Sequence, residues 1–279
     1  ERVLNTIELG HDHADRDVFF SSKGHDVPAL YSVLHAAGVI PDSLLCRLRR
    51  RGGLDGHPDS STPGIEVNSG SLGMGISKGK GIALAKDRLG RGGSVFVLTG
   101  DGELQEGQNW EALQSAAHLG IGRLNVIVDH NKVQSDKLVR NIVDLGALEE
   151  KLTAFGWRVA RCDGHDFRAL ALVLERFTTE RDRPKILIAD TIKGRGISFM
   201  EHPVALSASE GLYPWHSGAP DDATFAHAHA EVIARLNDRL ARLGLAPLRN
   251  NSGVAGPTTA PEALGEPPSP GAASAPPLH

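Results

Sequence analysis

The sequence has no surplus of positive charge, no long apolar run and almost no cysteine. Its 34 acidic residues outnumber its 30 lysines and arginines, giving a formal net charge of −4, which argues against nucleic acid as a partner. No apolar stretch approaches the roughly 20 residues that a membrane-spanning helix needs, and no charged-then-apolar leader opens the sequence. Cys46 and Cys162 are too few for a disulfide framework or a zinc site, so we expect a reduced, cytoplasmic setting.

The composition is that of a globular protein with a sizeable core. The 279 residues suffice for one large domain or two small ones, and 40% of them are hydrophobic against 23% charged. The sequence opens with Glu1 rather than methionine, so we expect an N-terminus that is processed or incomplete.

The end of the chain differs in composition from the rest. Eight of the sixteen prolines follow position 246, and large apolar side chains become rare there. Such a segment buries too little surface to offset the entropy of ordering it. We therefore predict a domain over residues 1–245 and a disordered tail over residues 246–279.

The body of the chain alternates strand and helix patterns. Short apolar runs predict strands at 94–99, 124–129, 157–161 and 185–191, and three- and four-residue spacing predicts helices at 107–118, 166–178 and 222–245. This alternation indicates an α/β fold, a doubly wound, mostly parallel sheet with helices on both faces. In such sheets ligands bind at the carboxyl ends of the strands.

Two neighbouring strand ends carry polar residues suited to a metal. Gly100-Asp101-Gly102 follows the first predicted strand, and Asn131 comes 30 residues after Asp101, at the end of the next. Carboxylate and amide oxygens are the ligands that magnesium or calcium prefers. Flanking glycines let a phosphate approach the backbone. Gly-Asp-Gly alone is a common turn, and the second strand end is what favours a cofactor site.

These residues resemble the thiamine diphosphate motif of the transketolase family. The resemblance rests on six blocks in the family's order across roughly residues 16–220. The blocks are Ser22-Lys-Gly-His25, Gly56-His57-Pro58, Gly70-Ser-Leu-Gly73, Gly100-Asp-Gly-Glu-Leu-Gln-Glu-Gly107, Lys193-Gly-Arg-Gly196 and Trp215-His216. Any one could arise by chance, but the ordered set is specific.

The resemblance implies a metal and diphosphate site. Asp101, Asn131 and the carbonyl of Val133 would bind magnesium or calcium. The backbone amide of Gly102 would hold the diphosphate of thiamine diphosphate, which Lys193 would also reach.

The resemblance assigns further residues to the rest of the cofactor. The carbonyl of Gly70 would accept the 4′-amino group, and Leu72 would hold the cofactor in its bent conformation. Gln134 would lie near the thiazolium ring. Glu106 and Glu111 would lie at the interface between cofactor sites.

Three of the thirteen histidines stand in matched blocks, and the others fit surface or core positions. Imidazoles hydrogen-bond hydroxyl and carbonyl groups and exchange protons near neutral pH. The resemblance implies that His25 and His57 contact the transferred ketol group and that His216 reaches the diphosphate. All three histidines would be catalytic, as proton-transfer and orienting groups.

A second glycine pattern invites a dinucleotide-binding interpretation. Gly73-Met-Gly75 with Gly79 has the spacing of that fingerprint, but residues 65–69 make a poor strand before it. No Walker lysine is present either, because Gly81 follows Lys80. Close helix packing and cofactor contact explain these glycines better.

The resemblance implies a thiamine diphosphate- and magnesium-dependent transfer of a two-carbon ketol unit from a ketose or ketose phosphate to an aldehyde acceptor. It stops near residue 220, so we expect the N-terminal subunit of a split transketolase, with two copies of each subunit and the pyrimidine-binding half supplied by the partner. The family's opening Ser-Gly-His block has no counterpart, and His130 stands where an asparagine or aspartate is usual. A donor other than a pentose phosphate would fit these departures.

Two other interpretations stay open. The α subunit of a thiamine-dependent 2-oxoacid dehydrogenase shares the Gly-Asp-Gly pattern, but not the Lys-Gly-Arg-Gly and Trp-His blocks. A non-catalytic subunit could bind the cofactor and serve regulation alone.

Overall fold

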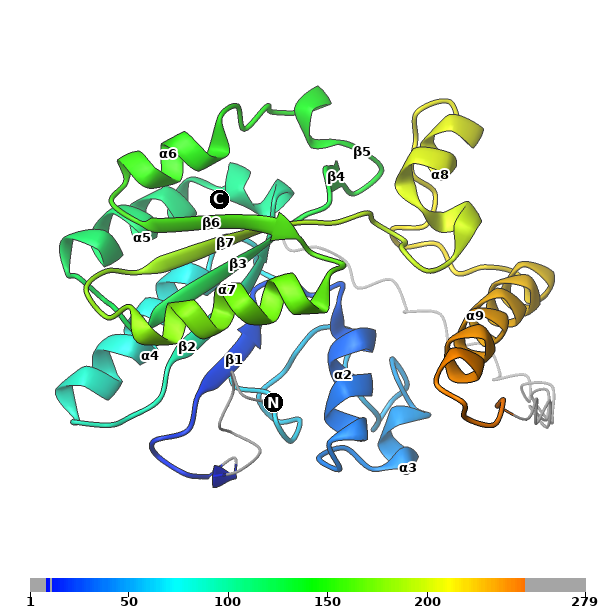
Figure 1. The fold of residues 1–279 in the computed structure, drawn as a ribbon, viewed down its shortest axis with the longest axis horizontal. Helices are drawn as coiled ribbons and strands as arrows, with labels where there is room; N and C mark the ends of the chain where they lie inside the picture. The colour runs from blue at the N-terminus through cyan, green and yellow to red at the C-terminus, as the bar shows by residue number, and fades with distance from the viewer. Residues whose placement is uncertain (1–8, 11, 249–279) are drawn as a thin grey trace, which may run out of the picture. The chain divides into compact units, whose positions relative to one another are not determined.

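A five-stranded parallel sheet forms the centre of the computed structural model, which describes residues 9–10 and 12–248 (Figure 1). The strand order is β1-β2-β3-β7-β6, and every neighbouring pair is parallel. The strands are β1 (Val18–Ser21), β2 (Val95–Gly100), β3 (Leu124–His130), β6 (Arg158–Asp163) and β7 (Lys185–Asp190). A separate antiparallel pair joins β4 (Val133–Gln134) to β5 (Lys137–Leu138). The predicted α/β class with a parallel sheet is confirmed.

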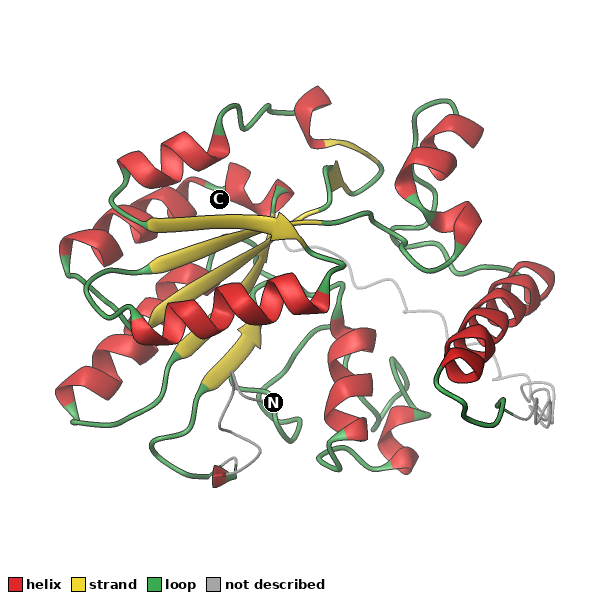
Figure 2. Ribbon diagram, viewed as in Figure 1, coloured by secondary structure: helices red, strands yellow, loops and turns green. Residues whose placement is uncertain are grey.

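Helices cover both faces of this sheet (Figure 2). The described residues as a whole form the helices α2 (Val27–Ala36), α3 (Asp42–Leu45), α4 (Gly75–Arg88), α5 (Gly107–His118), α6 (Leu148–Ala154), α7 (Phe167–Thr179), α8 (His202–Ala208) and α9 (Asp222–Arg242), and the 3₁₀ turns η1 (Gly102–Gln105), η2 (Val139–Asn141) and η3 (Ser198–Met200). Buried side chains of α4, α5 and α6 belong to the cluster on one face, and those of α7 belong to the cluster on the other.

The strand sequences explain this two-sided core. Side chains alternate between faces along a strand, so Val126 and Val128 pack with α4 and α5 whereas Ile127 packs with α7. The strand β7 repeats the pattern and is buried along Lys185–Ala189. Strands covered on both faces appear in the sequence as continuous apolar runs, which is why these central strands could be predicted.

The predicted elements agree closely with the structure. The helix at 107–118 has the predicted bounds, and the four predicted strands lie within two residues of theirs. The last helix ends at Arg242, three residues early, and Gly244 follows with a φ of +69°, as expected of a glycine that ends a helix. Residues 64–74 contain no strand before α4, so the dinucleotide fingerprint lacks its required context.

The chain divides by its contacts into two units, Glu1–Thr224 and Phe225–His279. The first contains the sheet, and the described part of the second is most of α9 and the turn after it. The predicted tail lies outside the described residues from position 249 onward. Within the described residues, no helix has the length and apolar character needed to cross a membrane.

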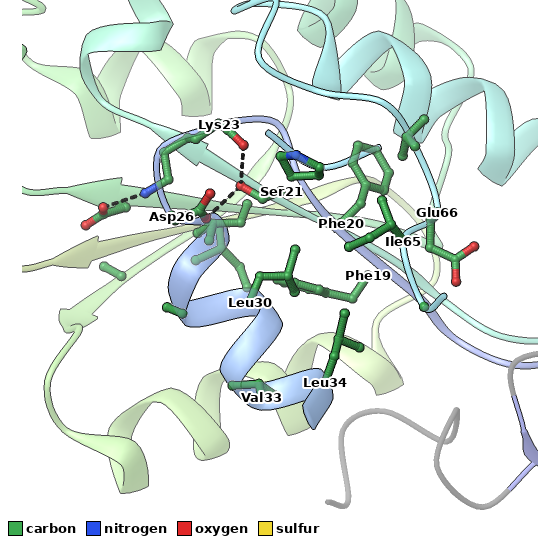
Figure 3. Close-up of a pocket in the computed structure, with 18 of the residues that line it drawn as sticks. Phe19, Phe20, Ser21, Lys23, Asp26, Leu30, Val33, Leu34, Ile65 and Glu66 are labelled. Atoms are coloured by element: carbon green, nitrogen blue, oxygen red, sulfur yellow. Dashed lines mark hydrogen bonds and ion pairs between the residues drawn. The ribbon is translucent and has the colours of Figure 1, made fainter. Parts of the chain in front are cut away.

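An apolar groove of about 610 Å³ lies on the α7 face of the sheet (Figure 3). Its apolar walls come from β1, α2, α7 and the segment 64–67. Its polar end contains Ser21, which donates to Asp26 over 2.7 Å, and Lys23, whose Nζ lies 2.7 Å from Oδ2 of Asp129. This polar end adjoins the carboxyl ends of the strands, where the predicted site residues lie.

Candidate active site

Four neighbouring strands end at the same edge of the sheet, and each is followed by a residue predicted to act in the site. His25 follows β1, Asp101 follows β2, Asn131 follows β3 and Lys193 follows β7. The parallel register pairs Gly100 with Asp129, next to both predicted metal ligands. Neighbouring strands lie about 4.8 Å apart, so the fold brings together residues that are far apart in the sequence.

Asp101 is fixed in place and almost completely enclosed. Its side chain is 2% exposed, and its two carboxylate oxygens accept hydrogen bonds from the amide of Gly102 over 2.8 Å and that of Lys132 over 2.6 Å. Burial raises the pKa of this carboxyl group above its usual range, although both hydrogen bonds oppose the rise. A cation beside Asp101 would relieve the cost of keeping that charge buried.

A second carboxylate orients the other predicted metal ligand. Asn131 donates its Nδ2 to Oδ2 of Asp129 over 3.0 Å, and its Oδ1 accepts from the amide of Val133 over 3.0 Å. Asp129 also accepts from Lys23 and from the Thr191 hydroxyl. Burial alone would raise the pKa of Asp129, but the Lys23 ammonium and these hydrogen bonds lower it. This arrangement determines which end of the Asn131 amide is the oxygen.

Glu103 joins three loops beneath the site. Its buried carboxylate, 3% exposed, accepts from the Ser22 hydroxyl, from the amide of Gly73 over 2.9 Å, from the Thr99 hydroxyl over 2.7 Å and from the amide of Gly100 over 3.2 Å. Sequence reasoning assigned no role to this residue, although it stands two positions after Asp101 in a matched block. A buried acid held by four donors fixes the loops after β1 and β2 against the turn before α4.

A lysine and two imidazoles lie near the predicted metal ligands. The Nζ of Lys193 lies 2.9 Å from Nδ1 of His216, and the His216 and His25 rings are 4.4 Å apart. Burial, reinforced by Lys23, lowers the pKa of Lys193 to about 8, and burial with Lys193 lowers that of His216 to about 4. Burial and nearby positive groups also lower the pKa of His25. Such a cluster suits a multiply charged anion.

The third predicted histidine is enclosed by glycines. The His57 ring lies 5.7 Å from that of His25. A methyl group on Gly24 would overlap the His57 ring, and one on Gly70 would lie 2.6 Å from its Cδ2. Gly70 also has a φ of +106°, a region that favours glycine. The structure therefore brings His25, His57 and His216 together.

The remaining predicted cofactor residues fall into two groups. Gln134 packs over Gly102, where an added methyl group would lie 2.9 Å from the glutamine Cβ, and Oε1 of Gln134 is buried with no hydrogen-bond partner among the described residues. By contrast, Leu72 is 40% exposed, and Glu106 and Glu111 are exposed. Gln134 therefore lies beside the predicted metal ligand Asp101, whereas Leu72, Glu106 and Glu111 are exposed to solvent.

The unusual His130 belongs to an ion-pair cluster beside the site. Asp190 accepts from Nδ1 of His130 over 2.7 Å, from Nε of Arg161 over 2.7 Å and from Nζ of Lys132 over 2.9 Å. Burial opposes the charge on Asp190, but these partners, Arg161 foremost, lower its pKa well below the usual range. His130 therefore helps to hold the ends of β3 and β7 together.

The chain matches a known family over most of its length. Residues 3–210 match the family described as transketolase, thiamine diphosphate binding domain. The chain is 38% identical over 221 residues to an apulose-4-phosphate transketolase subunit of Actinobacillus succinogenes, covering 78% of this chain and 76% of that protein. It is 39% identical over 193 residues to the 6-deoxy-6-sulfo-D-fructose transketolase subunit SqwG of Clostridium sp., covering 68% and 70% respectively.

Solved structures agree with this assignment. Transketolase from Leishmania mexicana superposes with a TM-score of 0.64 at 26% identity, over 83% of this chain and 40% of that one. The chain thus spans less than half of the solved transketolase it resembles. With the family match and the convergence of its motifs on one sheet edge, the chain belongs to the transketolase family, to which it is related through the thiamine diphosphate-binding domain.

Proposed function

We propose that this chain is the diphosphate-binding subunit of a split, magnesium-dependent transketolase. It would transfer a two-carbon ketol unit from a ketose or ketose phosphate to an aldehyde acceptor, with a second subunit completing the site. The observation that carries the proposal is the position of Asp101 and Asn131 at adjacent strand ends, close to the Lys193 ammonium and to the neutral His216 imidazole beside it.

The residues at the site fit a magnesium diphosphate. Asp101, the Asn131 amide and the Val133 carbonyl offer hard oxygen atoms, and the raised pKa of the buried Asp101 favours a cation beside it. Residues 9–10 and 12–248 hold no cluster of three or more His, Cys, Asp or Glu side chains able to bind a metal. A site with one carboxylate suits magnesium, which keeps water and phosphate oxygens in its shell.

The protein would supply anchoring and proton transfer, because the bound cofactor supplies a nucleophilic carbon and an electron sink. Gly102, Lys193 and His216 would hold the diphosphate. A pKa of about 4 keeps the His216 imidazole neutral at pH 7, so it can accept a hydrogen bond from the Lys193 ammonium. The lowered pKa of His25 likewise leaves a neutral imidazole that can exchange a proton with a substrate hydroxyl.

The proposal of a partner rests on the relatives and on exposed residues. Two relatives are named as transketolase subunits. Leu72, which would support the cofactor, is 40% exposed, and the predicted interface acids Glu106 and Glu111 are exposed as well. We propose two copies of each subunit, with sites at the interfaces.

The cytoplasm is the proposed compartment, because both cysteines are free.

The decisive experiment is a calorimetric titration of thiamine diphosphate and magnesium into the chain, alone and mixed with the protein encoded beside it. We expect tight binding in the mixture, followed by turnover of ketose but not 2-oxoacid donors. Asp101→Ala should abolish metal-dependent binding, whereas Glu175→Ala, a change in an exposed carboxylate of α7, should not. Turnover of 2-oxoacids would favour a dehydrogenase subunit, and binding without any turnover would favour a regulatory one.

A further inference from the structure

Two histidines with no part in the proposed function lie against the loop that carries Lys193. The Ile192 amide donates to Nε2 of His165 over 2.8 Å, and the next amide, that of Lys193, donates to Nδ1 of His202 over 3.2 Å. His165 lies between β6 and α7, whereas His202 begins α8. Two consecutive backbone amides at the predicted lysine are therefore bound by imidazoles from different parts of the chain.

The direction of these hydrogen bonds determines the form of each ring. A backbone amide can only donate, so the ring nitrogen that it faces carries a lone pair and no hydrogen. A neutral His165 consequently has its hydrogen on Nδ1, and a neutral His202 has its hydrogen on Nε2. Protonation of either ring would set N–H against N–H. Burial, followed by Lys132 and Lys193, lowers the pKa of His202 against the opposing charge of Glu201, which favours the neutral ring that can accept.

The loop around Lys193 is closed by further contacts. The His202 amide donates back to the Lys193 carbonyl over 2.8 Å, so the two residues are joined twice. Gly194 has a φ of +80°, and a methyl group there would overlap the carbonyl of Met200, so this turn requires glycine. The Tyr213 hydroxyl donates to the same Met200 carbonyl over 2.9 Å. The backbone on both sides of Lys193 is thereby fixed.

The amine of Lys193 is held by other residues. Its Nζ lies 2.9 Å from Nδ1 of His216 and 5.1 Å from the centre of the Tyr213 ring. A long lysine side chain loses much rotamer freedom when it is fixed on a ligand. A backbone that is already ordered leaves less freedom to be lost on binding. His165 and His202 therefore affect how well Lys193 can bind an anion, although neither needs to contact that anion.

We propose that His165 and His202 are positioning residues, which hold the backbone of Lys193 so that its amine can bind the diphosphate of the cofactor. The inference rests on the proposed function, which assigns Lys193 to that diphosphate. Each imidazole acts through one unprotonated ring nitrogen. Removing that nitrogen would leave a backbone amide without its acceptor and free the loop to move, so affinity for the diphosphate should fall.

Substitutions matched to each ring nitrogen test the proposal. Oδ1 of asparagine stands as many bonds from Cα as Nδ1 of histidine, and Oε1 of glutamine stands as many as Nε2. His202→Asn and His165→Gln therefore keep the acceptor, whereas the exchanged changes His202→Gln and His165→Asn displace it. With thiamine diphosphate and magnesium titrated into the chain and its partner, we expect the exchanged variants to bind about 5- to 50-fold more weakly than the matched ones. Equal affinities of matched and exchanged variants would overturn the proposal.

A variant without the amine shows whether the effect passes through Lys193. In Lys193→Met the exchanged substitutions should cause no further loss of affinity, because the side chain that the histidines position is gone. A further loss as large as the one in wild type would overturn the proposal and leave the histidines a general structural role. His118→Ala, at an exposed histidine that ends α5, is the control and should leave the affinity unchanged.

Nitrogen-15 NMR of the chain alone tests the ring forms independently of cofactor binding. At about pH 8 we expect the hydrogen of His165 on Nδ1 and that of His202 on Nε2, and the opposite form of either ring would contradict the proposal. If the wild-type mixture binds no cofactor, the proposed function fails. Magnesium pyrophosphate titrated into the same variants then decides on the positioning role. Weaker binding in the exchanged variants alone would support that role, and equal binding would overturn it.

Discussion

At the scale of single residues, two lysines and two aspartates interact within the site. Lys23 disfavours the positive charge of Lys193, and Asp129 and Asp101 offset part of this repulsion. Lys23 is neutralised directly by Asp129 at 2.7 Å, whereas Lys193 has a neutral imidazole as its closest partner. Lys193 is therefore the cation that gains most from an incoming anion.

Cofactor binding should be accompanied by proton uptake near pH 8. Burial lowers the pKa of Lys193 to about 8 in the free protein, and an adjacent diphosphate would favour the charged amine and raise that pKa. Between the two values the complex holds more protons than the free protein, so affinity should fall as pH rises through 8. Calorimetry in buffers of different ionisation enthalpy measures the uptake. Lys193→Met should lose it, and persistence of the uptake in that variant would assign it to another group.

Replacing Glu103 should weaken the whole fold. Four donors face the Glu103 carboxylate, and the side-chain amide of Glu103→Gln has only one oxygen that can accept from them. Hydrogen bonds to charged groups are worth about 1.5–3 kcal/mol each. We expect the free energy of unfolding to drop by about 2–4 kcal/mol, measured by urea denaturation. Glu106→Gln, a change in an exposed carboxylate three positions along, should alter it by less than about 0.5 kcal/mol. Equal effects of the two changes would show that the Glu103 contacts contribute little.

At the scale of elements, α7 offers a direct test of the link between sequence and stability. Its N-cap, Asp166, accepts hydrogen bonds from the amides of Arg168 and Ala169 over 2.9 and 3.1 Å. Asp166→Ala should cost about 1 kcal/mol in urea denaturation, and Asp166→Ser should retain most of that stability, because serine also caps helices. If serine and alanine were equally damaging, the cap itself would not be the cause.

The sequence predicted the long buried strands and missed shorter elements. Strands β2, β3 and β7 are continuous apolar runs, which are easily recognised. The strand β1 has four residues and the helix α2 starts at a proline-containing turn, so neither gives a long periodic signal. Their positions depend on packing against distant parts of the chain, which no local pattern specifies.

The same limit applies to the site. Asp101 and Asn131 could be predicted because each directly follows a recognisable strand. The support given by Lys23 to Asp129 spans 106 positions, and the bond from Ser22 to Glu103 spans 81. Polar pairs so far apart in the chain show no recognisable spacing in the sequence. The residues that orient the predicted metal ligands could therefore be identified only from the fold.

At the scale of the whole molecule, an exposed apolar loop lies next to η1, the turn that follows the proposed metal ligand Asp101. Ile142 and Val143 are 46% and 54% exposed, and the carbonyl of Val143 accepts a hydrogen bond from Gln105 over 3.0 Å, which ties the loop to η1. Exposed apolar side chains that lie together are typical of an interface. The proposed partner subunit would cover them.

Charges placed in this loop should impair assembly and leave the fold intact. We expect the double change Ile142→Asp and Val143→Asp to weaken association with the partner by at least about 10-fold, measured by analytical ultracentrifugation, because burying unpaired carboxylates is unfavourable. The circular dichroism spectrum should not change, since both side chains are exposed in the single chain. Leu119→Asp, at an equally exposed leucine after α5, should assemble normally. Normal assembly of the double variant would place the interface elsewhere.

The carboxylate of Glu103 also decides how the site responds to its ligand. The amides of Gly73 and Gly100 donate to its two oxygens, so neither can exchange its hydrogen with solvent until its hydrogen bond to Glu103 opens. If the residues around Glu103 are already ordered before the cofactor binds, hydrogen exchange at these two glycines should be slow both with and without cofactor. Cofactor binding then loses little entropy in ordering these residues, and more of the free energy of cofactor binding can favour association with the proposed second subunit.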